Sequence, residues 1–245
     1  MSEKETVWGE GGFDERFLNF RDVIVPCMGN LEAVFYDFFK NLIKEDSPLV
    51  CELGCGDGAT MEGLLRINPT IRGVLVDGSS FMLEQAKRRL SAFGTMEYVE
   101  SDFSELTNNG LGRRGFHLVY SSLALHHLEE EDKRHLLKHV ERALLSGGYF
   151  VNMDIVVPPS KDIEEWYERV YRMEMDEAAR KRGIESVADE VIKRASAPEH
   201  RKRLLTLEEE LELLKETGFI EVECYYKYMG FCVYGGRKSP AISTG

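Results

Sequence analysis

A run of glycines at residues 54–58 is the feature of this sequence best suited to binding a ligand. It follows the apolar stretch Val50–Leu53 and precedes a segment with helical spacing, so a strand would turn through glycines into a helix. Glycine lets the backbone turn sharply and approach a ligand closely. Such turns are common ligand sites in α/β sheets. The residues of the turn expected to bind are Gly54, Cys55, Gly56 and Gly58.

The acid before this turn separates two classes of ligand. Gly54, Gly56 and Ala59 also satisfy the G-x-G-x-x-G/A pattern of dinucleotide-binding turns. A carboxylate at Glu52 that points into the site would be repelled by a pyrophosphate, whereas a ligand with an ammonium and a sulfonium would suit it. The turn also lacks the lysine of a phosphate-binding P-loop. Glu52 therefore favours a cationic nucleoside, with NAD as the rival ligand.

Three further pairs of residues follow stretches expected to be strands. They are Asp77 and Gly78, Asp102 and Phe103, and Ser121 and Ser122. An acid such as Asp77 accepts hydrogen bonds from ribose hydroxyls, although aspartate is also a good helix N-cap. The acid–aromatic pair could bind adenine or could equally be a cap beside a core side chain. Because parallel strands end at one edge of a sheet, we expect these pairs to share a crevice with the glycine turn.

Strands and helices alternate along most of the chain. The expected strands are 48–53, 73–76, 96–100, 117–121 and 148–157, and the expected helices are 31–43, 59–67, 80–92 and 130–145. A last helix, 206–217, precedes two adjacent strands at 219–226 and 230–234. This order predicts a Rossmann-like α/β fold: a seven-stranded, mostly parallel sheet with a C-terminal antiparallel β-hairpin and a helical insert before the last helix.

We expect one domain over residues 1–245, with an N-terminal helical segment at 1–45 and the helical insert at 158–203. In the insert, Trp166, Val170 and Met173 have i, i+4, i+7 spacing, which favours packing in the core. The alternatives are a lid over a pocket and, through an exposed apolar face, a homodimer.

Composition narrows the class of protein. The formal net charge of −12 argues against broad electrostatic binding of nucleic acid. No apolar stretch approaches the roughly 18 residues that span a bilayer, and the polar N-terminus does not resemble a secretory signal. We therefore expect a cytoplasmic protein that is not bound to a membrane. The odd count of five cysteines, with no C-x-x-C pair, favours small buried thiols over disulfides or a zinc site.

The histidines allow two kinds of chemistry. His126 and His127 are candidate general bases, since a neutral imidazole is available near pH 7. Their position at the start of a helical region favours capping or hydrogen bonding to backbone instead. His127, His135 and His139 suggest a metal cluster. However, only the last two share a helix face, and no third ligand is apparent, so we predict no metal site.

Taken together and in this order, these motifs resemble the class I S-adenosylmethionine methyltransferases over about Phe13 to Arg237. The resemblance implies S-adenosylmethionine as cofactor. It also implies that the glycine turn and Glu52 hold the methionine part, that Asp77 binds ribose, and that Asp102 and Phe103 frame adenine. Methyl transfer mainly requires alignment of acceptor, methyl and sulfur, so a catalytic side chain is not required and the sequence identifies none.

The segment before the first strand is similar to carboxy-S-adenosylmethionine synthases. The similarity lies in Phe13–Arg16, Val25-Pro26, Asn30 and the long insert. Met28 stands where that subfamily has a tyrosine at the cofactor, so Met28 is also expected at the cofactor site. The carboxylate-binding arginine of that subfamily has no evident counterpart here. Arg16 and Arg21 could meet a carboxylate, but they are expected to be surface charges. We therefore predict a methyltransferase with a small-molecule acceptor. A synthase-like enzyme, a non-catalytic S-adenosylmethionine-binding protein and a methyltransferase of RNA or protein are the alternatives.

Overall fold

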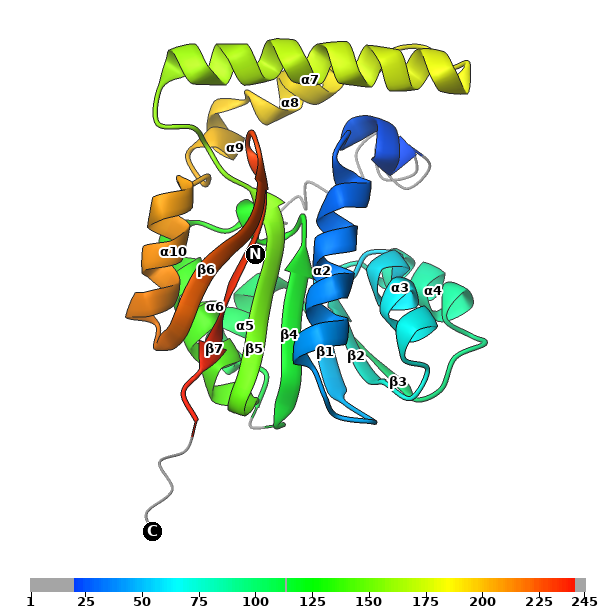
Figure 1. Ribbon diagram of the computed structural model, residues 1–245, viewed down its shortest axis with the longest axis vertical. Coiled ribbons are helices and arrows are strands. Elements are labelled where there is room, and N and C mark those ends of the chain that lie inside the picture. The colour runs from blue at the N-terminus through cyan, green and yellow to red at the C-terminus, as the bar shows by residue number, and fades with distance from the viewer. Residues whose placement is uncertain (1–19, 113, 241–245) are drawn as a thin grey trace, which may run out of the picture.

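A seven-stranded sheet forms the centre of the computed structural model, which describes residues 20–112 and 114–240 (Figure 1). The strands are β1 (Leu49–Leu53), β2 (Arg72–Asp77), β3 (Met96–Glu100), β4 (Phe116–Ser122), β5 (Leu144–Ile155), β6 (Phe219–Tyr228) and β7 (Phe231–Lys238). Their order is β3-β2-β1-β4-β5-β7-β6. The strands β1 to β5 pair in parallel, and β7 is antiparallel to both β5 and β6. The predicted Rossmann-like fold and its C-terminal antiparallel strands are confirmed.

Helices cover both faces of the sheet. One apolar core lies under α2 (Met28–Leu42), α3 (Ala59–Ile67) and α4 (Ser80–Arg89). The other lies under α5 (Phe103–Asn109), α6 (Glu130–Ala143) and α10 (Leu207–Glu216). Because parallel strands are covered on both sides, β1 and β4 are almost wholly buried. The sequence predicted each of these helices except α5, which is only seven residues long.

The insert consists of α7 (Lys161–Arg182), α8 (Ala188–Ala195) and α9 (Pro198–Arg201). Figure 1 shows α7 and α8 across the end of the sheet at which the parallel strands finish. The prediction that Trp166 and Met173 pack in a core is wrong, because these side chains are 50% and 69% exposed. The inner face of α7 instead carries Tyr171 and Met175, one helical turn apart.

Long-range polar contacts hold the insert and the last helix in place. The hydroxyl of Tyr171 accepts a hydrogen bond from the Gly230 amide at 2.7 Å. On the face of the sheet covered by α5, α6 and α10, the buried Lys133 Nζ lies 2.5 Å from Glu210 Oε1 and so joins α6 to α10. The same Nζ donates to the carbonyl of Arg203, at the end of the insert, at 3.3 Å. The insert is therefore tied to the domain through pairs distant in sequence.

The structure bears on two expectations from composition, which concern membrane-spanning helices and the cysteines. Within residues 20–112 and 114–240, no helix is both long and apolar enough to cross a bilayer. All five cysteines are free thiols, and four of them are buried. The resemblance at Phe13–Arg16 lies outside the described residues.

Candidate active site

A cavity of about 440 Å³ opens where β1, β2, β3 and β4 end. Nine of the twelve residues predicted to bind the ligand line it. They are Glu52, Gly54, Cys55, Gly56, Asp77, Gly78, Asp102, Phe103 and Ser122. Arg21, which sequence reasoning placed among surface charges, also lines this cavity. Four loops that are separate in sequence therefore surround one cavity.

The glycine turn has the backbone that its composition favours. Gly54 and Gly56 have φ values of +68° and +51°, in the left-handed region that side chains disfavour. A Cβ at Gly54 would lie only 2.4 Å from the Cβ of Ala124, so this residue must be glycine for the loops to meet. A Cβ at Gly56 would have nothing within 4 Å. Gly56 therefore faces open space inside the cavity.

Asp77 fixes the turn against the end of β2. Its Oδ2 accepts a hydrogen bond from the Gly56 amide at 2.8 Å, and its Oδ1 accepts one from the Ser79 amide at 2.9 Å. The N-cap of α4 is Ser79, whose hydroxyl accepts from the Met82 amide. The helix-cap alternative for Asp77 is therefore wrong, and this carboxylate combines loop positioning with a place on the cavity wall.

The sequence left open whether Asp102 and Phe103 are a helix cap and a core residue or part of a ligand site, and both descriptions apply. Asp102 is the N-cap of α5, with Oδ1 accepting from the Glu105 amide at 2.9 Å. Phe103 packs against the core under α5 and α6. Both residues also line the cavity. A capping aspartate and a packed phenylalanine can therefore still form the wall of a ligand site.

Glu52 is a buried carboxyl group on the wall of the cavity. Its side chain is 1% exposed, and Oε2 has no hydrogen-bond partner within the described part of the chain. Burial, with smaller contributions from the nearby carboxylates of Asp57 and Asp77, raises the pKa of this carboxyl to about 8. A cationic group in the cavity would supply the missing partner and favour the ionised form. These residues thus fit a ligand that carries an ammonium.

The other three predicted residues lie outside this wall. Ser121 is fully buried and donates to the Leu53 carbonyl at 2.8 Å, which joins β4 to β1. Gly58 is the N-cap of α3, and a Cβ there would lie 3.2 Å from Ala86 of α4. Met28 is buried at the start of α2. Each of the three supports the elements around the cavity.

A second cavity of similar volume, about 440 Å³, lies under the insert. Most of its wall is apolar, with side chains from α7, α8, β5 and the segment before α2, including Ile24, Ile155, Tyr171, Met175 and Val191. It shares Leu123 and His127 with the first cavity. Leu123 has φ +53°, a costly conformation for a non-glycine residue that is typical of functional sites. Sequence reasoning offered a pocket under the insert as an alternative. It could not identify the wall, which extends from residue 24 to residue 231.

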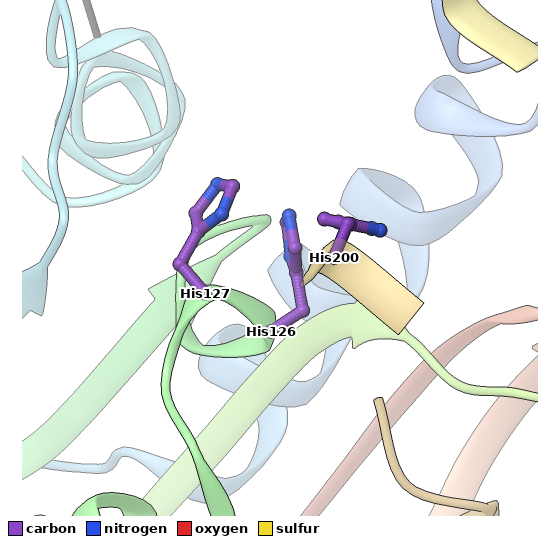
Figure 2. A group of neighbouring side chains, drawn as sticks. All are labelled: His126, His127 and His200. Carbon is purple, nitrogen blue, oxygen red and sulfur yellow. The ribbon is translucent and has the colours of Figure 1, made fainter. Parts of the chain in front are cut away.

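Three imidazoles meet at the second cavity (Figure 2). His126 and His127 belong to the 3-10 turn η1 (Leu125–His127), and His200 comes from α9. Nδ1 of His126 lies 2.5 Å from Oδ1 of the buried Asp154. Burial alone would raise the pKa of Asp154, but the contact with His126 and the charge of Lys133 lower it below its usual value.

This histidine group differs from the one considered in the sequence. His135 lies beside Glu131 at 3.1 Å, and Nε2 of His139 lies 3.1 Å from the Thr107 carbonyl. Within the described part of the chain, neither belongs to a group able to share a metal ion, whereas His126, His127 and His200 do. No spacing rule could have found His200, which only tertiary packing brings to η1.

The strand order, the glycine turn and the cavity at the carboxyl ends of the strands define a nucleoside-binding Rossmann-like fold of the methyltransferase type. Residues 50–148 match the family described as "Methyltransferase domain". The chain therefore carries a class I S-adenosylmethionine-dependent methyltransferase domain, and its cofactor is S-adenosylmethionine.

Relatives extend this similarity beyond the matched segment. The chain is 22% identical to a carboxy-S-adenosyl-L-methionine synthase from Nautilia profundicola, over 91% of this chain and 92% of that protein. It is 25% identical to the synthase of the same name from Nitratiruptor, over 91% and 90%. Human N-acetylserotonin methyltransferase, solved with S-adenosylmethionine, has a similar fold with a TM-score of 0.54 and 17% identity. The similarity covers 94% of this chain and 59% of that one.

Proposed function

We propose that this enzyme transfers the methyl group of S-adenosylmethionine to a small molecule held in the second cavity. The observation that carries the proposal is the shared boundary: Leu123 and His127 line both cavities. An in-line displacement requires the acceptor directly behind the methyl carbon, and two adjoining cavities of this size offer that arrangement. The enclosing insert, residues 158–203, acts as the lid that excludes water.

The first cavity binds the cofactor through the predicted residues. Glu52 pairs with the ammonium of the methionine part, and Arg21 pairs with its carboxylate. Asp77 accepts the ribose hydroxyls, while Asp102 and Phe103 frame adenine. Support comes from the unpartnered Oε2 of Glu52 and from the open space at Gly56. The bound cofactor supplies an electrophilic methyl group with a good leaving group, so the side chains need only align and desolvate.

One observation favours a second candidate function, a carboxyl-transferring enzyme like the synthases that share most of this chain's length. Arg194 and Arg203 line the second cavity, and Nε of Arg203 is buried without a hydrogen-bond partner among residues 20–112 and 114–240. Guanidinium groups there would hold a carboxylate. The mainly apolar wall of the cavity instead favours an apolar acceptor, and methyl transfer is the primary proposal.

Two matched variants on α7 test the methyl-transfer proposal. Met175→Trp places a large ring in the second cavity, whereas Met173→Trp places it on the solvent side of the same helix. We expect calorimetric S-adenosylhomocysteine affinity to stay within about twofold of wild type in both. Transfer of a deuterated methyl group to metabolites of a cell extract should be lost only in Met175→Trp. If Met175→Trp does not fold, Val191→Trp fills the same cavity.

The same assay separates the alternatives. A deuterated small molecule detected by mass spectrometry supports the proposal, whereas label found only in RNA or protein contradicts the acceptor class. Native mass spectrometry of the purified enzyme gives a further distinction. A bound cofactor heavier by a carboxyl group would favour the carboxyl-transferring alternative.

A further inference from the structure

We propose that His126, His127 and His200 form a binding site for one divalent transition-metal ion, best suited to Zn²⁺. Each ring offers a nitrogen, and these nitrogens all lie within 4.8 Å of one another. Figure 2 shows His126 between the other two rings. Its ring centroid is 4.0 Å from that of His127 and 5.4 Å from that of His200. Three histidines with an open fourth position are a common catalytic zinc arrangement.

Oxygen atoms orient two of the three rings as metal ligands require. Nδ1 of His126 faces Asp154 Oδ1 at 2.5 Å, and Nδ1 of His200 faces the Ala195 carbonyl at 3.1 Å. A ring whose Nδ1–H donates to oxygen presents the lone pair of Nε2, and metal-binding histidines are usually held in this way. The geometry therefore assigns Nε2 as the metal-binding atom of both residues.

Asp154 is built into the fold as the support for His126. The carboxylate is 2% exposed and accepts hydrogen bonds from the backbone amides of His126 at 3.0 Å and Ile155 at 2.9 Å. Asn152 donates a further hydrogen bond at 3.3 Å. This fixed negative charge offsets part of the positive charge of a bound cation.

Binding requires a small closure of the cluster. Zn–N bonds of about 2.0–2.1 Å in a tetrahedral site place ligand nitrogens about 3.3 Å apart. The carboxylate holds His126, while His200 lies on the four-residue helix α9 and is half-buried. Movement of His200 toward η1 is therefore the adjustment that completes the site.

The position of the site indicates the role of a bound ion in methyl transfer. This role rests on the proposed function. His127 lines both cavities, so the ion lies at the boundary between acceptor and cofactor. An acceptor hydroxyl or thiol bound at the fourth position has a lowered pKa and loses its proton to water. Its oxygen or sulfur lone pair then bonds to the methyl carbon, and the electrons of the broken S–C bond return to the cofactor sulfur.

Metal binding is tested directly, without reference to turnover. Chelator-treated protein is titrated with ZnCl₂ by calorimetry and with CoCl₂ by visible absorption. We expect one ion per chain and the intense absorption of tetrahedral Co²⁺. His200→Ala should weaken Zn²⁺ binding by more than roughly 100-fold, because loss of a supporting residue alone costs roughly 10–100-fold. The control His135→Ala, at an exposed histidine of α6, should bind like wild type.

Asp154→Asn tests the positioning residue. It should weaken Zn²⁺ binding by roughly 10–100-fold while S-adenosylhomocysteine affinity is unchanged. Absence of Zn²⁺ binding, or equal binding by wild type and His200→Ala, would overturn the site. Methyl transfer by metal-free protein in that case would leave the proposed function intact. Conversely, stoichiometric Zn²⁺ binding lost in His200→Ala supports the site even if no acceptor is found.

Discussion

The two cavities have similar volumes but different origins in the chain. The first cavity, called the cofactor cavity because we propose that it binds the cofactor, is lined by residues 52–127 and Arg21. Apart from Arg21, these residues lie at or after the ends of four strands. The second cavity combines the segment before α2, the end of β5, the insert and the start of β7. A local motif can build the first cavity because parallel strands bring their ends together. The second cavity depends on contacts between distant segments.

The two walls also differ in charge. The cofactor cavity carries the carboxyl groups of Glu52, Asp57, Asp77 and Asp102. The second cavity is mainly apolar, and its polar residues include histidines, arginines and glutamates. The acidic wall suits a cationic ligand, while the apolar wall suits an apolar one. Substitutions in the two regions should therefore affect different properties.

The largest effect on stability is expected at Lys133 of α6, which contacts both α10 and the end of the insert. Lys133→Met leaves the buried Glu210 without its partner and removes the hydrogen bond to the Arg203 carbonyl. We expect the free energy of unfolding to fall by about 3–5 kcal/mol, the cost of an unpaired buried charge. Urea denaturation measures the loss. S-adenosylhomocysteine affinity of the folded variant should be unchanged.

The double variant Lys133→Met, Glu210→Leu is the matched control. Removing both charges replaces a buried ion pair by apolar side chains, which is often nearly neutral. We therefore expect recovery of most of the lost stability. A single variant as stable as wild type would show that this ion pair does not hold the insert and α10 to the domain.

In the cofactor cavity we expect a loss of similar size in ligand affinity instead of stability. Gly56→Val puts a branched side chain into the open space that the turn faces, so S-adenosylhomocysteine affinity should fall by at least roughly 100-fold, about 2.7 kcal/mol. Gly112→Val is the control, since Gly112 has φ +68° and open surroundings but lies outside both cavities. Calorimetry should show normal affinity for the control. Retained binding by Gly56→Val would show that the glycine turn does not contact the ligand.

The last expected effect depends on pH and concerns Glu52; for a change of one pH unit it is the smallest of the three. The pKa of this carboxyl is raised to about 8 in the folded state, from 4.5. Between these pH values the unfolded chain ionises while the folded one does not, so wild type loses stability as pH rises. Glu52→Gln removes this cost. Its stability relative to wild type should increase by up to about 1.4 kcal/mol per pH unit from pH 4.5 to 8.

Denaturation curves of both proteins at pH 5 and pH 8 measure this difference. The same substitution should weaken cofactor binding, because it removes the partner of the ammonium. A stability difference that does not change with pH would show that Glu52 ionises normally in the fold. Stability gained together with affinity lost would instead identify Glu52 as a residue retained for binding at a cost to the fold.

Much of the fold and of the cofactor cavity was predictable from local patterns. The strand–glycine–helix order predicted helix 59–67 with the same bounds as α3, and strand 96–100 with the same bounds as β3. Nine residues at or next to strand ends were predicted to meet, and they do line one cavity. Local prediction was less successful for the insert, where helical spacing identified the wrong face of α7.

The sequence by itself determined the alternating elements, the glycine turn and the acids around it, because each depends on residues close together in the chain and on the common edge of a parallel sheet. Only the tertiary structure decided that Tyr171 and Met175 face inward, that His200 meets His126 and His127, and that a second cavity adjoins the first. These features depend on how distant segments pack, which no periodicity in a single segment records.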